Sequence, residues 1–311
     1  MGKTAFLFPG QGAQAVGMGK ALADLGGTVG DLFNEADDVL GYKLSDLMFN
    51  GPEADLTLTE NTQPALVTVA MAAYQHLISE TDLRPDYVAG HSLGEYAAIC
   101  AAGGFSFADA VRLVNLRGKA MQAAVPVGVG SMAAMLNMAV DKVESVCQQA
   151  SEETGKICVP ANYNTAAQIV ISGHKDAVEK AVALAKEQGA KRCVILAVSA
   201  PFHCPLMQPA AEKMAEALAA TEITDLTTPL IANVTADSVT EGSQIRDLLV
   251  KQVTGAVRWE ASIKQLQALG VDTFVEVGSG KVLTGMMRRI DRKANALFVN
   301  TPDDVQKLKN A

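Results

Sequence analysis

A serine stands between two glycines at the point where a short apolar strand is expected to pass into a helix. Residues 87–95 read Tyr-Val-Ala-Gly-His-Ser-Leu-Gly-Glu, with Ser92 at the centre of the turn. Residues 87–89 have the apolar character of a buried strand, and residues 95–102 are strong helix formers that end at a glycine pair. This strand-turn-helix pattern is typical of a nucleophile elbow, and the helix N-terminus favours negative charge beside the hydroxyl. An N-cap serine in a glycine-containing loop is the alternative.

The segments that flank this turn alternate strands with helices. Strand-like runs at residues 5–8, 230–234 and 273–277 lie between helical segments. This alternation indicates a mostly parallel sheet covered by helices. We therefore expect a large α/β-hydrolase-like domain around Ser92.

The middle of the chain has a different period. Its expected order is strand 130–136, helix 141–151, strand 157–161, strand 168–172, helix 176–188 and strand 192–198. The order β-α-β-β-α-β is typical of a ferredoxin-like split βαβ unit. We expect a large catalytic domain at residues 1–127 and 199–311, a small ferredoxin-like domain inserted at 128–198, and an active site in the cleft between them.

A serine needs a base to take its proton, and the chain offers four histidines. His203 stands in a segment with a proline two residues away on either side, which fixes the local backbone and excludes a regular helix or strand. His76 lies in a helical run, and His174 lies in a polar turn. His91 is adjacent to Ser92, so its side chain should diverge from the serine and shape the turn. His203 is the predicted base, and an ordinary loop histidine is the alternative.

One cation is expected to point into the interior. In the helix predicted at residues 108–122, Arg117 lies in the middle of the apolar face, where an unpaired guanidinium is costly and needs an anion. A structural salt bridge is the alternative. The opposite, solvated face is predicted to carry the polar residues Asp109, Arg112, Asn115 and Lys119.

The composition excludes several classes of protein. The formal charge of −8 argues against nucleic acid or an anionic membrane as the general partner. Five cysteines without a C-x-x-C pair indicate reduced thiols, and neither a signal segment nor a membrane span is evident. We therefore expect a cytoplasmic enzyme.

Five short motifs, taken together, point to a known family. They are residues 90–95, residues 8–12 with 16–19, residues 62–65, residues 201–203 and residues 257–259. In order from Thr4 to about Val299, they resemble the motif set of bacterial malonyl-CoA:acyl carrier protein transacylases. Two departures are Ala13, where the family usually has serine, and Ser279, where it usually has proline.

The resemblance implies roles for individual residues. Ser92 would carry the malonyl group as an ester, and His203 would act as general base and acid. Arg117 would bind the malonyl carboxylate, while the backbone N–H groups of Gln11 and Leu93 would form the oxyanion hole. A main-chain carbonyl near Gln252 would replace the third member of a triad. Further pocket residues implied by the resemblance are Gln63, Asn162 and Gln252.

The resemblance also implies the partners. Malonyl-CoA and a phosphopantetheinylated acyl carrier protein would be the substrates, with no metal or redox cofactor, and the enzyme would be a monomer. Because the carrier is expected to be acidic, local basic groups must overcome the net charge of the enzyme. The candidates are Lys191, Arg192, Arg288 and Arg289, for which solvated surface charge is the alternative.

Two other classes of function compete with an acyltransferase. The segment 10–15 matches the dinucleotide fingerprint G-x-G-x-x-A, but no acidic residue ends a second strand, and Asp31 opens a helical run instead. A noncatalytic carrier-binding module would never acylate Ser92. A thioesterase is chemically closer, since it would only have to admit water to the ester.

Overall fold

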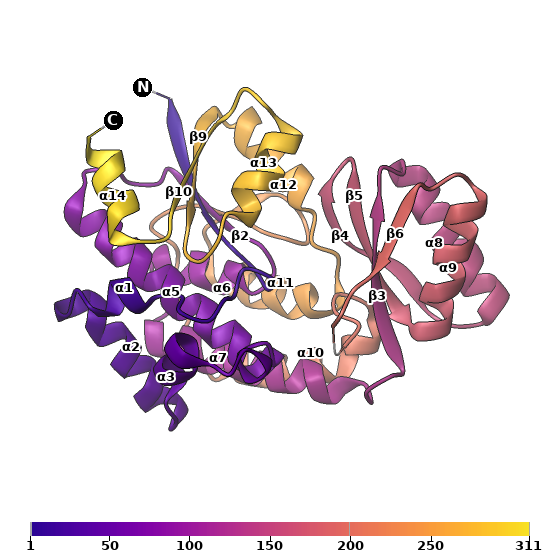
Figure 1. Cartoon of the computed structure of the whole chain (residues 1–311), viewed down its shortest axis with the longest axis horizontal. Helices are drawn as coiled ribbons and strands as arrows, with labels where there is room; N and C mark the ends of the chain where they lie inside the picture. The colour runs from indigo at the N-terminus through magenta and orange to yellow at the C-terminus, as the bar shows by residue number, and fades with distance from the viewer. Residues whose placement is uncertain (1, 199, 311) are drawn as a thin grey trace.

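Six strands form the central sheet of the larger part of the molecule (Figure 1). The computed structural model describes residues 2–198 and 200–310, so the predicted boundary at residue 199 lies outside the described residues. The strand order is β10-β9-β1-β2-β7-β8, and every pair is parallel except β7 with β8. The strands are β1 (Lys3–Phe8), β2 (Tyr87–Gly90), β7 (Leu230–Ile231), β8 (Ser238–Val239), β9 (Val271–Val277) and β10 (Asn295–Val299).

Alternate residues of these strands enter two different cores. Phe6 and Phe8 pack into the larger core, whereas Ala5 and Leu7 face the smaller one, as the period of two along a strand requires. The smaller core is covered by α12 and α13, and the larger by the remaining helices of this part. The sheet is therefore the middle layer of an α/β/α sandwich.

Along the chain, the helices of the large part lie between these strands and after the last of them (Figure 1). They are α1 (Lys20–Ala23), α2 (Gly27–Leu40), α3 (Leu44–Asn50), α4 (Glu53–Leu56), α5 (Thr59–Glu80), α6 (Gly94–Ala101), α7 (Phe107–Ala124), the 3₁₀ turn η1 (Pro205–Met207), α10 (Gln208–Ala219), α11 (Gly242–Thr254), α12 (Trp259–Ala268), α13 (Val282–Ile290) and α14 (Pro302–Lys309).

A second, antiparallel sheet has the order β4-β5-β3-β6. Two helices cover its outer face, and Met132, Ala134 and Val170 on its other face pack toward Phe202. Its elements are β3 (Gly130–Leu136), α8 (Val140–Thr154), β4 (Cys158–Thr165), β5 (Gln168–His174), α9 (Lys175–Glu187) and β6 (Arg192–Ile195). The predicted α/β fold with a ferredoxin-like β-α-β-β-α-β unit is confirmed.

The last strand of this unit is shorter than predicted. β6 ends at Ile195, whereas the sequence predicts a strand to residue 198. Leu196 still donates its backbone N–H to the carbonyl oxygen of Met132 at 2.9 Å, and residues 196–198 line a cavity beside Ser92. Beyond Leu196 the chain follows the cavity wall and no longer forms a strand.

Two further expectations concern the whole chain. The five cysteines are free thiols. Within residues 2–198 and 200–310, no helix has the length and apolar character needed to cross a membrane.

Candidate active site

Ser92 stands at the sharp turn between β2 and α6. Its φ of 53° lies in the left-handed region, which a non-glycine residue rarely adopts. The turn is held from outside, because the N–H of Ser92 donates to Asn233 Oδ1 at 2.8 Å and Asn233 Nδ2 donates to the carbonyl oxygen of Gly90 at 2.7 Å. Surrounding hydrogen bonds thus maintain a strained conformation at the serine.

Both glycines of the G-x-S-x-G motif are required by close backbone approach. A Cβ on Gly90 would lie 2.0 Å from backbone atoms of Gly94, and a Cβ on Gly94 would lie 2.2 Å from the carbonyl oxygen of Phe8. No side chain fits at either position without moving the backbone. The elbow interpretation of this motif therefore has a direct steric basis.

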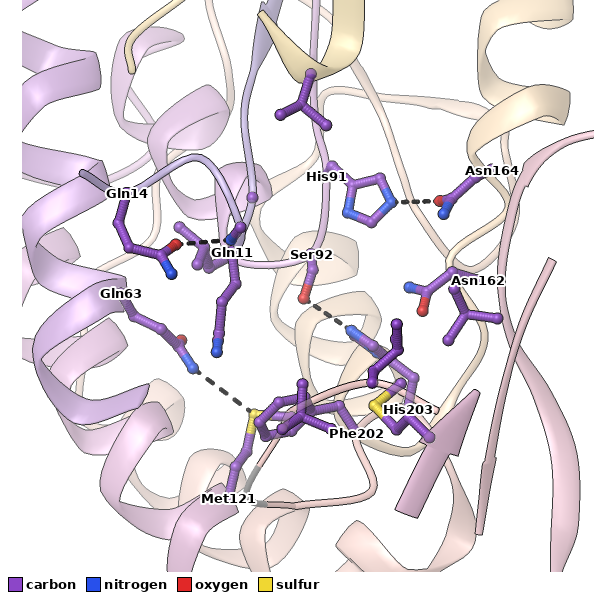
Figure 2. A pocket seen from close by; sticks show the side chains of 18 of the residues that line it. Gln11, Gln14, Gln63, His91, Ser92, Met121, Asn162, Asn164, Phe202 and His203 are labelled. Atoms are coloured by element: carbon purple, nitrogen blue, oxygen red, sulfur yellow. Dashed lines mark hydrogen bonds between the residues drawn. The ribbon is translucent and has the colours of Figure 1, made fainter. Parts of the chain in front are cut away.

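His203 lies beside Ser92 although 111 residues separate the two along the chain. Its Nε2 is 2.7 Å from Ser92 Oγ (Figure 2). Its Nδ1 faces two main-chain carbonyls, those of Gln252 at 2.9 Å and Gly255 at 3.2 Å. Because a carbonyl only accepts, Nδ1 carries the proton and Nε2 accepts from the serine hydroxyl.

Burial keeps this imidazole neutral. Burial, followed by the positive charge of Arg117, lowers the pKa of His203 from 6.5 to about 3, although the two carbonyls act to raise it. A neutral Nε2 is the form that can take the serine proton at pH 7.

The other three histidines make different contacts, and His174 ends strand β5, whereas the sequence predicts a polar turn. His76 is buried in α5, and His174 Nδ1 accepts the N–H of Ile157 at 3.1 Å. The ring of His91 packs 5.4 Å from that of Trp259, and His91 Nε2 lies 2.8 Å from Asn164 Oδ1 (Figure 2). These contacts agree with a role for His91 in shaping the turn.

Arg117 is a fully buried cation, with 1% of its surface exposed. Its guanidinium donates from Nη1 to Gln63 Oε1 at 2.8 Å and from Nη2 to Gln252 Oε1 at 2.8 Å and Ser92 Oγ at 3.1 Å. Burial lowers its pKa. Among the residues described, Arg117 forms no salt bridge, since no carboxylate oxygen lies within 4.0 Å of its guanidinium. A buried charge held by neutral amides can accept an anion beside the serine.

Asn115 is not on the solvated face, and this part of the prediction is wrong. It is buried, and its Nδ2 donates to the carbonyl oxygen of Glu60 at 2.9 Å. Pro64 explains the contact, because a proline has no N–H to give to the carbonyl four residues earlier. Asn115 replaces the missing bond and ties α7 to α5, where Gln63 meets Arg117.

The two residues predicted to form the oxyanion hole, Gln11 and Leu93, line the cavity. In the described part of the chain, neither backbone N–H takes part in a hydrogen bond. Figure 2 shows Gln11 and Gln63 on one side of Ser92, with Asn162, Asn164 and His203 on the other. Of the predicted pocket residues, Gln63 and Asn162 line the cavity, whereas Gln252 is fully buried and its side-chain amide donates to the main-chain carbonyl oxygen of Ser92.

The cavity around Ser92 has a volume of about 410 Å³. Its lining comes from the loop after β1, from the elbow, from Met132 and Asn162 of the antiparallel sheet, and from residues 196–198, which follow β6. The site thus lies between the two sheets, as the sequence predicts.

The four basic candidates are exposed on the surface. Arg289 Nη1 donates to Gln168 Oε1 at 3.3 Å, and Gln168 lines the cavity. The strand register places Gln168 opposite Leu136, and Leu136 opposite Arg192. Arg289 and Arg192 therefore lie along the same end of the small sheet.

Sequence reasoning missed two site residues, Glu95 and Asn233. Asn233 holds the elbow from the end of β7, and its own N–H donates to Glu95 Oε1 at 2.8 Å. Glu95 is the last residue of the motif at residues 90–95, so its place three residues after the serine is the signal that could have identified it. Asn233 has no such local signal.

The two departures from the family motifs contact each other. Ser279 Oγ donates to the carbonyl oxygen of Ala13 at 2.7 Å. Neither residue lines the cavity around Ser92. The altered pair is therefore a local loop contact away from the reacting groups.

A serine activated by a histidine at the carboxyl end of parallel strands places the protein among the α/β enzymes that transfer acyl groups. The chain belongs to the acyl transferase domain family, whose model matches residues 5–299.

Curated relatives cover nearly the whole chain. The malonyl CoA-acyl carrier protein transacylase of Bacillus subtilis is 48% identical over 306 residues, covering 98% of this chain and 96% of the relative. The Escherichia coli K12 protein of the same name is 46% identical over 305 residues, covering 97% of each. The resemblance predicted from the motifs is confirmed.

Solved structures agree with this assignment. An acyl-carrier-protein S-malonyltransferase from Bartonella henselae is 49% identical, with a TM-score of 0.95 over 99% of this chain and 98% of that one. A malonyl-transacylase solved in complex with its type II PKS acyl-carrier protein is 40% identical, with a TM-score of 0.95 over 99% of this chain and 100% of that one.

Proposed function

We propose that the protein transfers the malonyl group from malonyl-CoA to the phosphopantetheine thiol of an acyl carrier protein, for fatty acid biosynthesis. The observation that carries the proposal is the place of Arg117, a buried guanidinium without an anionic partner within 4.0 Å among the described residues, 3.1 Å from Ser92 Oγ. In a malonyl thioester, one methylene separates the carboxylate from the reacting carbonyl. A guanidinium beside the nucleophile can bind that carboxylate through two hydrogen bonds.

In the first half-reaction, His203 Nε2 takes the hydroxyl proton of Ser92 while Oγ attacks the thioester carbonyl. The N–H groups of Gln11 and Leu93 hold the resulting oxyanion. The carbon–sulfur bond then breaks, and His203 returns its proton to the sulfur as coenzyme A leaves. Malonyl remains on Ser92 as an ester.

The second half-reaction runs the same steps with another thiol. The phosphopantetheine thiol gives its proton to His203, and its sulfur attacks the ester carbonyl. The ester bond breaks, and Ser92 recovers its proton from His203. The carbonyls of Gln252 and Gly255 hold the Nδ1 proton throughout, in the place of an acidic triad member.

The neighbouring amides position these groups. Gln63 and Gln252 hold the two ends of the guanidinium of Arg117. Asn162 is buried on the opposite side of the cavity and is proposed to contact the acyl group or its pantetheine arm. The reaction balances without a metal or redox cofactor, since each step moves only a proton and an acyl group.

Further assignments complete the proposal. Residues 1–127 and 199–311 would form the catalytic domain and residues 128–198 the inserted small domain. The enzyme would act as a cytoplasmic monomer. The acidic carrier would dock at Lys191, Arg192, Arg288 and Arg289; the position of Arg192 and Arg289 at one end of the small sheet supports this assignment.

The test is a transfer assay. Malonyl-CoA and a phosphopantetheinylated carrier protein are incubated with the enzyme, and the mass of the carrier is followed with time. We expect malonyl-carrier to accumulate with the wild type and not with Ser92→Ala. Equal accumulation with both enzymes, or none with the wild type, would refute the proposed function.

A further inference from the structure

A carboxyl group that takes no part in the mechanism lies buried behind the nucleophile. Glu95, in the first turn of α6, is 1% exposed and does not line the cavity. Its Oε1 accepts the backbone N–H of Asn233 at 2.8 Å, and its Oε2 accepts Gln252 Nε2 at 2.5 Å. Burying a carboxyl group costs free energy. The two short hydrogen bonds from site residues therefore indicate that Glu95 has a function at the site.

Gln252 is the link between Glu95 and the reacting groups. One hydrogen of its Nε2 goes to Glu95 and the other to the carbonyl oxygen of Ser92 at 2.8 Å. Its Oε1 is thereby turned toward Arg117 Nη2, 2.8 Å away. A rotated amide would set N–H groups against the guanidinium and its oxygen against two other oxygens. The acceptor at Glu95 thus favours one amide orientation.

We propose that Glu95 is a positioning residue for acyl selectivity: it holds the amide of Gln252 so that the guanidinium of Arg117 is fixed where the carboxylate of the acyl group must bind. The inference rests on the proposed function, since it concerns recognition of a carboxylate on the acyl group. Glu95 acts through Gln252 and Arg117 and touches no substrate.

The electrostatics of the site agree with this assignment. Burial raises the pKa of Glu95, and the two hydrogen bonds and the charge of Arg117 limit the net rise to a pKa of about 7. Both oxygens face N–H donors, so the contacts are those of a carboxylate. Above this pKa the negative charge lies behind Gln252, which leaves the guanidinium free for an incoming anion.

The test uses Glu95→Gln, which keeps the shape of the side chain. Its NH2 must face either the N–H of Asn233 or the NH2 of Gln252, and a donor then meets a donor. We expect the KM for malonyl-CoA to rise about 10- to 100-fold, as for loss of one hydrogen bond to a charged group, with a smaller change in kcat. The ratio of kcat/KM for malonyl-CoA to that for acetyl-CoA should fall by the same order.

Two controls separate positioning from general damage. Inactivation of Ser92 by phenylmethylsulfonyl fluoride, which has no carboxylate, should stay within about threefold of the wild-type rate. Glu276→Gln removes another buried carboxylate, one that accepts the N–H groups of Leu283 and Thr284, and should leave the malonyl-to-acetyl ratio unchanged. The E95Q change should add little to the selectivity loss of R117A, because both act on one interaction.

Three outcomes would overturn the proposal: an unchanged ratio in E95Q, an equal fall in malonyl, acetyl and sulfonyl reactions, or full additivity with R117A. If E95Q does not fold, Gln252→Met serves instead, because it removes the amide that Glu95 holds but keeps the main-chain carbonyl that His203 uses. The malonyl-to-acetyl ratio of kcat/KM must then fall in this variant. Absence of any malonyl ester on wild-type Ser92 would be a failure of the proposed function itself.

Discussion

The guanidinium of Arg117 is held by two side-chain amides and the serine hydroxyl. We expect Arg117→Ala to lower kcat/KM for malonyl-CoA by about 100-fold or more, because two charge-assisted hydrogen bonds to the carboxylate are lost. Acetyl transfer should fall much less or rise. Steady-state kinetics with both thioesters would check this, and an unchanged ratio would mean that Arg117 is only structural.

The low pKa of His203 makes a second prediction. With a pKa of about 3, lowered by burial and then by Arg117, with a smaller effect of His91, the imidazole stays neutral as pH falls through 6.5. The rate at which phenylmethylsulfonyl fluoride inactivates Ser92 should therefore remain nearly constant from pH 8 to about 5. A histidine with the ordinary pKa would give a fall of about tenfold between pH 7.5 and 5.5. Such a fall would contradict the neutral-base assignment.

At the residue scale, the sequence predicts those site residues that a local sequence pattern distinguishes. Ser92 and His203 stand out because glycines or prolines restrict the backbone around them, and Arg117 stands out on an apolar helix face. Asn233 could not be found in the same way, since its bond to Ser92 spans 141 residues. Asn115 was misplaced because its partner is a carbonyl freed by Pro64 in another helix.

At the scale of elements, the contact between α5 and α7 fixes Gln63 against Arg117. A Cβ on Gly118 would lie 2.7 Å from both Glu60 Cα and the carbonyl oxygen of Thr59. We expect Gly118→Ala to lower the free energy of unfolding by about 1–3 kcal/mol, because backbone atoms must move. Thermal unfolding would measure the loss.

The matched control is Gly285→Ala in α13. A Cβ there meets nothing within 4 Å, and its φ is not in the left-handed region. This substitution should stabilise the protein by about 0.5–1 kcal/mol, since alanine favours the helix. Equal effects of the two alanines would contradict the close packing at Gly118.

The order of elements in the small sheet was predictable from its period, but the ends of its strands were not. β4 continues to Thr165 past the predicted end at residue 161, with irregular register beside Pro160. β7 keeps only two of the five residues predicted for that strand, because the chain turns at Asn233 toward the elbow. Tertiary contacts at the site, absent from local propensity, set these boundaries.

At the scale of the whole molecule, a negative enzyme must receive an acidic carrier. We expect reversal of Arg288 and Arg289 to Glu to raise the KM for carrier protein about tenfold and to flatten its dependence on salt, because rim charges are screened over roughly 10 Å at moderate ionic strength. Acylation of Ser92 by malonyl-CoA should be little affected. Kinetics at several salt concentrations would measure both.

The matched control reverses the exposed residues Lys142 and Lys213, which changes the net charge by the same amount. This variant should leave the KM for carrier protein close to the wild-type value. If transfer to carrier protein and transfer to free pantetheine fall by one factor in R288E/R289E, the basic residues act on the active site and the docking proposal fails.

The whole scheme depends on a covalent intermediate at one residue. The direct measurement is the intact mass of the enzyme after brief incubation with malonyl-CoA, followed by peptide mapping. We predict one malonyl group per chain, located on Ser92 and absent from Ser92→Ala. A malonyl adduct that persists in Ser92→Ala, or a wild-type enzyme that produces malonyl-carrier without ever carrying the ester, would contradict the account.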